Sequence, residues 1–277
     1  MALAVLAFAA LLAAPGGRPA AAPAGDCVGP APEAVRPDFE AEVIRLVNLR
    51  RRGAGLAPLK QVESLSSPAR WFARDMASDD YFEGHDSYDR RGGRLVRRCS
   101  WRTRVRSYEP KWSSLAENIA AGHETPAEVV DGWLHSPRHK ANLLGRGYWE
   151  TGAGFWAGGS QGFYWVQDFG RRPGVFPLVI DDEAPRTQDP EVRLYVYGKW
   201  KEMRLRNDDG AFTPWRRFSN ELIWRLGEAA GTRSVSVELR SGTLRASASD
   251  TIELVAASAT AGPRPRAGRG AEGRIGE

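Results

Sequence analysis

Apolar residues recur every three or four positions in three stretches of the first half of the chain, the spacing of amphipathic helices. The first stretch, Asp38–Arg52, has acidic residues at its start and arginines at its end, so its charges complement a helix dipole. The second covers about Ser67–Ser78 and begins with a Ser-Pro pair, typical of a helix start. The third begins with Thr125–Glu128, a capping box, and ends before Pro137. A second short helix that carries His139 is expected after the bend at this proline.

Two aromatic-rich segments farther along are candidates for the strands of a sheet. They are Trp149–Trp156 and Phe163–Phe169, joined by the glycine-rich segment Gly158–Gly162. This segment matches the G-x-S-x-G pattern of hydrolases, in which the serine stands between a strand and a helix. Here a strand is expected on both sides of Ser160. The segment is therefore interpreted as a hairpin loop and not as a nucleophile site.

The second half of the chain lacks helical spacing and consists of short alternating runs separated by turn-forming residues. These runs are Val192–Tyr197, Glu202–Arg206, Leu222–Leu226, Ser234–Leu239 and Thr251–Val255. Short strands at regular spacing predict an antiparallel β-sandwich. Three prolines around an acidic triplet at 181–183 mark the boundary between the first half of the chain and this predicted β-sandwich. From about Ala256 onward Gly, Pro, Arg and small residues dominate, which is typical of a disordered tail.

The composition allows real cores and gives the chain a positive charge. Hydrophobic residues make up 42% of the 277 positions and ten residues are tryptophan, which excludes a wholly disordered chain. The net charge of +5 favours anionic surroundings. Eight arginines lie between Arg90 and Arg106 with no acid among them, and a solvated face is favoured there over a polyanion-binding surface. Because no interleaved aromatic stacking pattern accompanies them, nucleic acid is not expected as a partner.

The N-terminal residues predict export. Met1–Ala14 is an apolar run too short to span a bilayer, and small-residue cleavage sites follow it, as in a secretory signal peptide. No other segment is apolar enough to cross a membrane. The two cysteines, Cys27 and Cys99, are too few for a metal site of their own, and in an exported protein they could form a disulfide.

The predicted organisation follows from these boundaries. It is a signal peptide at 1–24, a linker at 25–36, a first domain at 37–172, a linker at 173–187, a β-sandwich at 188–256 and a disordered tail at 257–277. The mature protein is expected to be secreted, and extracellular or associated with the cell surface.

All four histidines lie in or just ahead of the segment 115–144, which points to a polar site there: His85, His123, His135 and His139. Five motifs occur in order over about Phe39–Arg171: the first helix, Leu59 with the helix after it, Tyr81–Ser87, Ala116–Ala120, and Trp133–Leu144. In this order they resemble the CAP superfamily of cysteine-rich secretory, antigen 5 and pathogenesis-related proteins, in its bacterial secreted branch. The later segment 207–251 resembles the immunoglobulin-like modules of bacterial surface proteins.

The resemblance implies an α+β protein: an α-β-α sandwich with a central cleft, the CAP domain, followed by an all-β immunoglobulin-like sandwich. It implies that His85 and His139 are the cleft histidines and that Glu117 is the first cleft glutamate. Family members with a full set carry a second glutamate three residues after the tryptophan, and this chain has Ser136 there. Three residues are alternatives for that role: Glu124, Asp131 and His135.

Three functions follow from this site. The favoured one is an extracellular binding module that holds a lipid, a peptide or a cell-wall polymer in its cleft, with the second domain presenting it. Two imidazoles and a carboxylate are suitable ligands for Zn²⁺, so His85 and His139 are candidate metal ligands and zinc is the candidate cofactor. His123 and His135 are expected to have structural roles.

The first alternative is a metal-assisted hydrolase in which Glu117 acts as general base, with His85 and His139 holding a metal or a water. Because the chain has no H-E-x-x-H motif and no convincing nucleophile, an enzyme is not favoured. The second alternative is a structural or adhesive surface protein, in which the arginine segment and the β-sandwich make the contacts.

Overall fold

The structure is a computed structural model that describes residues 27–256. The predicted signal peptide at 1–24 and the predicted tail at 257–277 lie outside the described residues. Within the described range, no helix is both long and apolar enough to cross a membrane.

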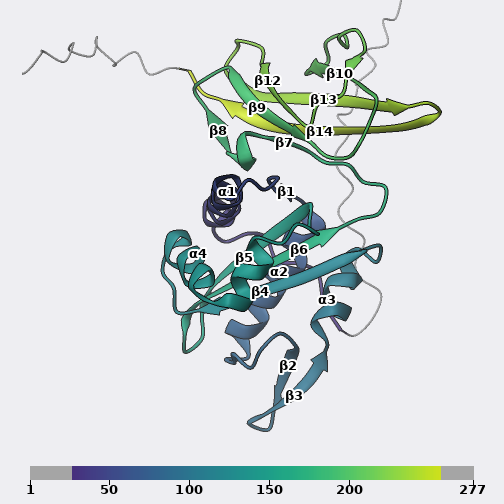
Figure 1. Cartoon of the computed structure of the whole chain (residues 1–277). Coiled ribbons are helices and arrows are strands. Elements are labelled where there is room, and N and C mark those ends of the chain that lie inside the picture. Colours follow the sequence, from purple (N-terminus) through teal and green to yellow (C-terminus); the bar gives the residue numbers. More distant parts are fainter. Residues whose placement is uncertain (1–26, 257–277) are drawn as a thin grey trace, which may run out of the picture.

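The first unit is a four-stranded sheet with helices on both faces, as the predicted α-β-α sandwich requires (Figure 1). The strand order is β1-β5-β6-β4; β1 pairs parallel with β5, and the other pairs are antiparallel. The strands are β1 (Lys60–Gln61), β4 (Ser114–Ala121), β5 (Glu150–Gly158) and β6 (Gly162–Arg171). The helices are α1 (Pro37–Gly53), α2 (Glu63–Ser78), α3 (Trp101–Tyr108), α4 (Pro126–His135) and α5 (Pro137–Leu143).

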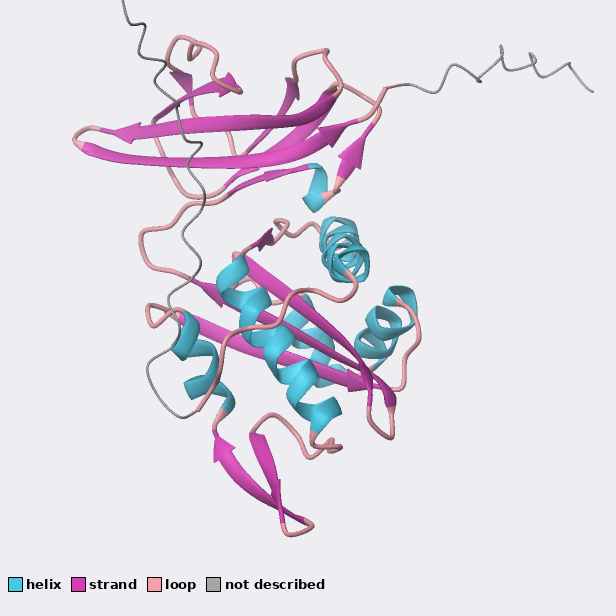
Figure 2. Cartoon of the chain, turned by 180° about the vertical axis from the view of Figure 1, so that it is seen from behind, coloured by secondary structure: helices cyan, strands magenta, loops and turns pink. Residues whose placement is uncertain are grey.

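The two faces of this sheet have separate cores. Residues of α1, α4 and α5 pack on one face around Trp133 and Trp165, whereas α2 packs on the other face around Phe72 and Tyr164. Figure 2 shows α2 lying along the sheet. Alternation along β4 divides its side chains between the cores, so that Ala120 contributes to the first core and Ile119 to the second.

Most predicted elements of this unit are confirmed, and α2 differs at its start. The capping box at Thr125 and the bend at Pro137 are present. Helix α2 begins at Glu63, four residues before the expected cap, with Pro68 inside it. The reason is tertiary: a Cβ at Gly152 of β5 would lie 2.1 Å from the Ser66 nitrogen, so the helix lies directly on the sheet backbone. Packing over this glycine outweighs the local cap signal.

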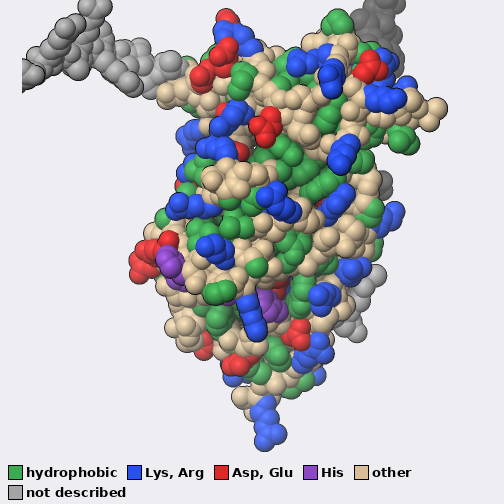
Figure 3. All heavy atoms as spheres, viewed as in Figure 1, with side chains coloured by type: hydrophobic (Ala, Val, Ile, Leu, Met, Phe, Trp, Pro, Cys, Tyr) green, Lys and Arg blue, Asp and Glu red, His purple; other side chains and the backbone are tan. Residues whose placement is uncertain are grey.

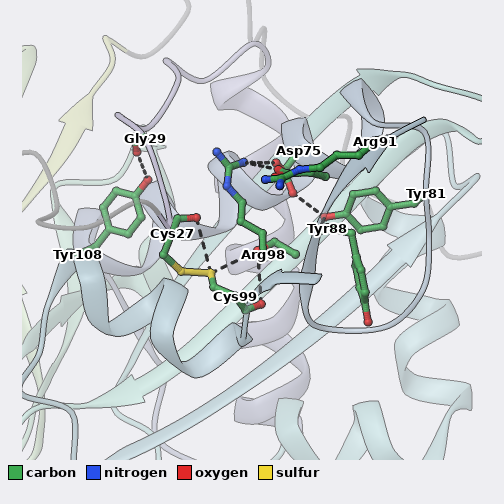
Figure 4. A network of polar contacts seen from close by, with 11 residues as sticks. Cys27, Gly29, Asp75, Tyr81, Tyr88, Arg91, Arg98, Cys99 and Tyr108 are labelled. Carbon is green, nitrogen blue, oxygen red and sulfur yellow. Dashed lines mark hydrogen bonds and ion pairs between the residues drawn. A yellow bond between two sulfur atoms is a disulfide. The ribbon is translucent and has the colours of Figure 1, made fainter. Parts of the chain in front are cut away.

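The arginine segment folds into a hairpin and a helix held by the disulfide. The hairpin strands are β2 (Ser87–Arg91) and β3 (Arg94–Cys99), and α3 follows at once. Cys99 is bonded to Cys27 with a Cα–Cα distance of 5.6 Å, which confirms the disulfide (Figure 4). Close by, the Tyr108 hydroxyl donates to the Gly29 carbonyl at 2.9 Å and Tyr81 donates to Asp75 at 2.5 Å. The start of the described chain is thereby fixed to the first unit.

The second unit consists of two sheets around one core. The larger has the order β11-β10-β13-β14-β8 and the smaller β12-β9-β7. Their strands are β7 (Leu178–Ile180), β8 (Arg186–Thr187), β9 (Glu191–Val196), β10 (Glu202–Asn207), β11 (Arg216–Arg217), β12 (Glu221–Arg225), β13 (Gly231–Ser241) and β14 (Leu244–Leu254). The expected strand runs all appear, and the two sheets share buried residues such as Leu194, Val237 and Ile252. This is the expected sandwich, while its immunoglobulin-like identity stays a prediction.

The segment 173–187 differs from the expected linker. It contributes β7, a short 3-10 helix η1 (Asp181–Glu183) and β8 to the second unit. Leu178, Val179 and Ile180 are each at most 1% exposed and pack into the sandwich core. The surrounding prolines obscured this short apolar run, because prolines are also typical of linkers.

The second unit lies beside α1 of the first (Figure 1), and buried contacts join the two units. The Asn48 amide of α1 donates to the Leu59 carbonyl at 2.9 Å and to the Asp182 carbonyl at 3.1 Å. The Lys60 ammonium lies in contact with the carboxyl groups of Glu183 and Asp250. Because these groups are mostly buried, the second unit is fixed on the α1 end of the first.

Candidate functional site

A pocket of about 460 Å³ lies where the outer edge of β4 meets α4 and α5. Strand β4 is at one end of the sheet order, so its outer edge has no neighbouring strand. The pocket is lined mainly by apolar side chains and imidazoles, among them Phe82, His85, Ile119, Trp133, Ser136 and His139. Histidine side chains are visible at the surface of the first unit in Figure 3. The pocket combines apolar walls with a few polar groups, as ligand sites do.

His85 reaches the pocket from the loop between α2 and β2. Its Nδ1 lies 2.9 Å from Glu117 Oε1, and its side chain is 40% exposed while that of Glu117 is 1% exposed. A carboxylate accepts the hydrogen bond, so Nδ1–H donates and Nε2 is left for the pocket. The backbone carbonyl of His85 also accepts from Arg104 at 2.9 Å. These bonds fix both the loop and the orientation of the ring.

Glu117 is buried beneath His85 and does not line the pocket. Its second carboxylate oxygen forms an ion pair with Arg104 of α3, whose side chain is fully buried and stacks over the Phe72 ring at 3.5 Å. Burial alone would raise the pKa of Glu117, but Arg104 and His85 outweigh it and the pKa is lowered. The carboxylate is therefore ionised and supports His85 from below.

Asp168 faces Glu117 from the neighbouring strand β6, as its register partner. Its carboxyl oxygens are buried and accept no hydrogen bond from any described residue. Burial, and next the charge of Glu117, raise the pKa of Asp168 well above its usual value. Two adjacent carboxyls thus have opposite pKa shifts, because Arg104 pairs with only one of them.

His139 enters the pocket from the opposite side, on α5. Its backbone carbonyl accepts from the Asn118 side chain of β4 at 3.1 Å, which ties α5 to the strand. Burial, and next the proximity of His85, lower the pKa of His139. At neutral pH this imidazole is therefore uncharged.

The structure places His85 and His139 at the same pocket. His123, for which a structural role is expected, also lines this pocket, with its ring 3.0 Å from the position of a Cβ on Gly132. Of the proposed substitutes for the second glutamate, none lines the pocket: His135 and Asp131 form an exposed pair at 3.3 Å, and Glu124 is also exposed.

Sequence reasoning missed Arg104 and Asp168. Arg104 is one of eight arginines in its segment, and only its contact with Glu117 and His85 distinguishes it. Asp168 lies in the predicted strand Phe163–Phe169, but its position opposite Glu117 depends on the strand register. No sequence signal for either role was available in a single chain.

The pocket does not fit a zinc site that uses Glu117 as a ligand. Both carboxylate oxygens of Glu117 are engaged, one by His85 and one by Arg104. Among the described residues, no group of three or more His, Cys, Asp or Glu is arranged to hold a metal ion. His85 and His139 alone are fewer protein ligands than zinc sites use.

Comparisons with known proteins identify the first unit. The profile of CAP, the cysteine-rich secretory protein family, matches residues 44–169. The uncharacterized protein YkwD of Bacillus subtilis is 34% identical over 131 residues, which is 47% of this chain and 46% of the Bacillus protein. The chain thus spans less than half the length of this relative.

Solved structures with a similar arrangement come from bacterial outer-surface and extracellular proteins. An outer surface protein of Borrelia burgdorferi is 20% identical, with a TM-score of 0.43 over 51% of this chain and 98% of its own. An extracellular protein with an SCP domain from Bacillus anthracis is 26% identical, with a TM-score of 0.41 over 49% of this chain and 41% of its own.

The profile match covers residues 44–169, and hence His85, Glu117 and His139. The first unit of this chain is therefore a CAP domain of the cysteine-rich secretory protein family.

Proposed function

We propose that the protein is an extracellular binding module and that the His85–His139 pocket holds its ligand. The observation that carries this proposal is the orientation of His85. Glu117 and Arg104, both buried, hold this partly exposed ring so that Nε2 is free. A ring supported in this way is prepared to bind a partner before the partner arrives.

The chemistry of the pocket favours a ligand with both apolar and hydrogen-bonding groups. Phe82, Ile119 and Trp133 supply apolar walls. The neutral His139 supplies a hydrogen-bond acceptor and the Nε2 of His85 a further polar group, which suit the hydroxyl or amide groups of a peptide or cell-wall fragment.

The hydrolase alternative stays a prediction that the geometry does not favour. A general base has to reach the proton that it removes, whereas Glu117 is buried and engaged through both oxygens. Its lowered pKa also weakens it as a base. The adhesive alternative and the presentation by the second unit stay predictions as well.

The test is a calorimetric titration of the protein with three separate probes: soluble peptidoglycan fragments, a short-chain phospholipid and Zn²⁺. His85→Ala/His139→Ala is compared with His135→Ala, a matched control because His135 is 79% exposed outside the pocket. We expect an organic probe to bind the wild type and the control and to lose at least about tenfold in affinity in the double variant.

Equal binding by the double variant and the wild type would refute the role of the pocket. Micromolar zinc binding lost only in the double variant would instead favour the metal-assisted alternative. Retained folding of each variant is checked by circular dichroism.

A further inference from the structure

A groove of about 950 Å³ lies between the two units, on a different part of the molecule from the histidine pocket. We call it the interunit groove. The first unit contributes Arg52, Arg146, Trp149 and Arg171 to its walls, and the second contributes Tyr195 and Lys199. No residue lines both the interunit groove and the histidine pocket.

Positive charge dominates the interunit groove. Four cationic side chains line it, against the single acid Glu221. Arg52 is paired with Asp182. Among the described residues, the side chains of Arg146 and Lys199 have neither a hydrogen-bond partner nor an ion-pair partner, and both residues are exposed. Across the face seen in Figure 3, Lys and Arg side chains extend over both units.

Arg171 is the third cationic side chain of the groove that is not in an ion pair with a described residue, and its position is fixed by stacking. Its guanidinium stacks over the Trp149 ring at 3.7 Å, and no described residue forms a hydrogen bond with that guanidinium. Trp149 in turn stacks on Tyr197 at 4.8 Å, and the Tyr197 hydroxyl donates to the Pro58 carbonyl at 2.6 Å. A guanidinium held by stacking keeps its planar set of donors for carboxylate or phosphate, and loses little entropy on binding.

The aromatic residues of the groove are arranged for a glycan and not for bases. Trp149 is covered by Arg171 and Tyr197, so it offers no free face on which a base could stack. Tyr148 and Tyr195 line the groove with hydroxyls that have no hydrogen-bond partner among the described residues. Such hydroxyls suit the many donors and acceptors of sugars.

We propose that the interunit groove binds an anionic glycan, with Arg146, Arg171 and Lys199 contacting its phosphate or carboxylate groups. The site is formed only when both units are present, because each contributes cations and tyrosines. It gives the second unit a role in binding, in addition to any ligand of the histidine pocket.

The experiment measures binding of the full chain to phosphorylated dextran, which carries phosphates, and to polygalacturonate, which carries carboxylates. Dextran serves as the uncharged probe. The variant Arg146→Ala/Lys199→Ala is compared with Arg94→Ala/Lys111→Ala, which removes the same charges at exposed positions outside the groove. Glu221→Gln removes the single acid of the groove.

We expect one polyanion or both to bind, and dextran not to bind. Affinity falls about tenfold or more in the groove double variant and stays unchanged in the control. Glu221→Gln strengthens binding about twofold. The tighter of the two polyanions identifies phosphate or carboxylate as the preferred group.

Equal losses in the two double variants would overturn the proposal, because they would show only a diffuse charge effect. The proposal would also be overturned if neither polyanion bound. The same holds if a single-stranded oligonucleotide bound more tightly than both polyanions and its binding depended equally on Arg146 and Lys199. His85→Ala/His139→Ala is expected to leave polyanion binding unchanged, so failure of one site is distinguishable from failure of the other.

Discussion

Arg104→Met tests whether the site depends on its buried ion pair. The side chains of Arg104 and Glu117 are 0% and 1% exposed, so the substitution leaves a carboxylate buried without its counter-ion. Such a loss costs about 3–5 kcal/mol, which is a large share of the 5–15 kcal/mol that typically stabilises a protein. The double variant Arg104→Met/Glu117→Gln leaves no charge stranded, so it should cost less than the single variant.

The assay is urea unfolding followed by tryptophan fluorescence, with circular dichroism to confirm that both probes report one transition. Arg94→Met is the control, because Arg94 is exposed and lies outside the site; its effect should stay within about 0.5 kcal/mol. Two results would refute this account of the ion pair. One is a loss of unfolding free energy below about 1 kcal/mol for Arg104→Met. The other is a loss in the double variant that equals the sum of the losses in Arg104→Met and Glu117→Gln.

Two further stability predictions follow. Cys27→Ser/Cys99→Ser removes a disulfide between residues 72 positions apart. The entropy gained by the unfolded chain should lower the free energy of unfolding by about 4 kcal/mol. An unchanged midpoint of urea unfolding would contradict this prediction. Burial is the largest cause that raises the pKa of Asp75 to about 6, of Glu40 to about 7 and of Glu183 to about 8. Because the folded state then binds more protons than the unfolded state, the free energy of unfolding should fall as pH rises from about 4 to about 8. Glu183→Gln should flatten this fall between pH 6 and 8, and an identical slope would argue against the shift.

The sequence predicted those parts of the fold whose signals are local. The ends of α1 and α4 follow from charge placement and from the capping box at Thr125. Alternation predicted the middle of β13 and only the end of β14. The start of α2 did not follow, because it depends on how closely Gly152 lets the helix approach the sheet. Strand β7 was hidden for a similar reason, since three apolar residues between prolines fit a linker until a second sheet covers them.

The site residues stay a prediction, and the structure adds how they are arranged. Motif order placed His85, Glu117 and His139 together, and the structure agrees that His85 and His139 share a pocket. That Glu117 lies beneath the pocket depends on Arg104, which is 13 positions away and on another element. Spacing in the sequence carries no information about such a pair.

The uncovered side of β4 has a consequence for how molecules of this protein meet one another. A bare strand edge is a template on which a second chain can add a strand and begin to aggregate. Here the outward carbonyls of Ile119 and Glu117 accept from the side chains of Trp133 and Asn142, at 3.1 and 3.3 Å. These two side chains occupy backbone acceptors that an added strand would need, on the edge that also forms one wall of the pocket. A substitution that undocks Trp133 would therefore free the Ile119 carbonyl and open this edge of the sheet to a strand of a second molecule.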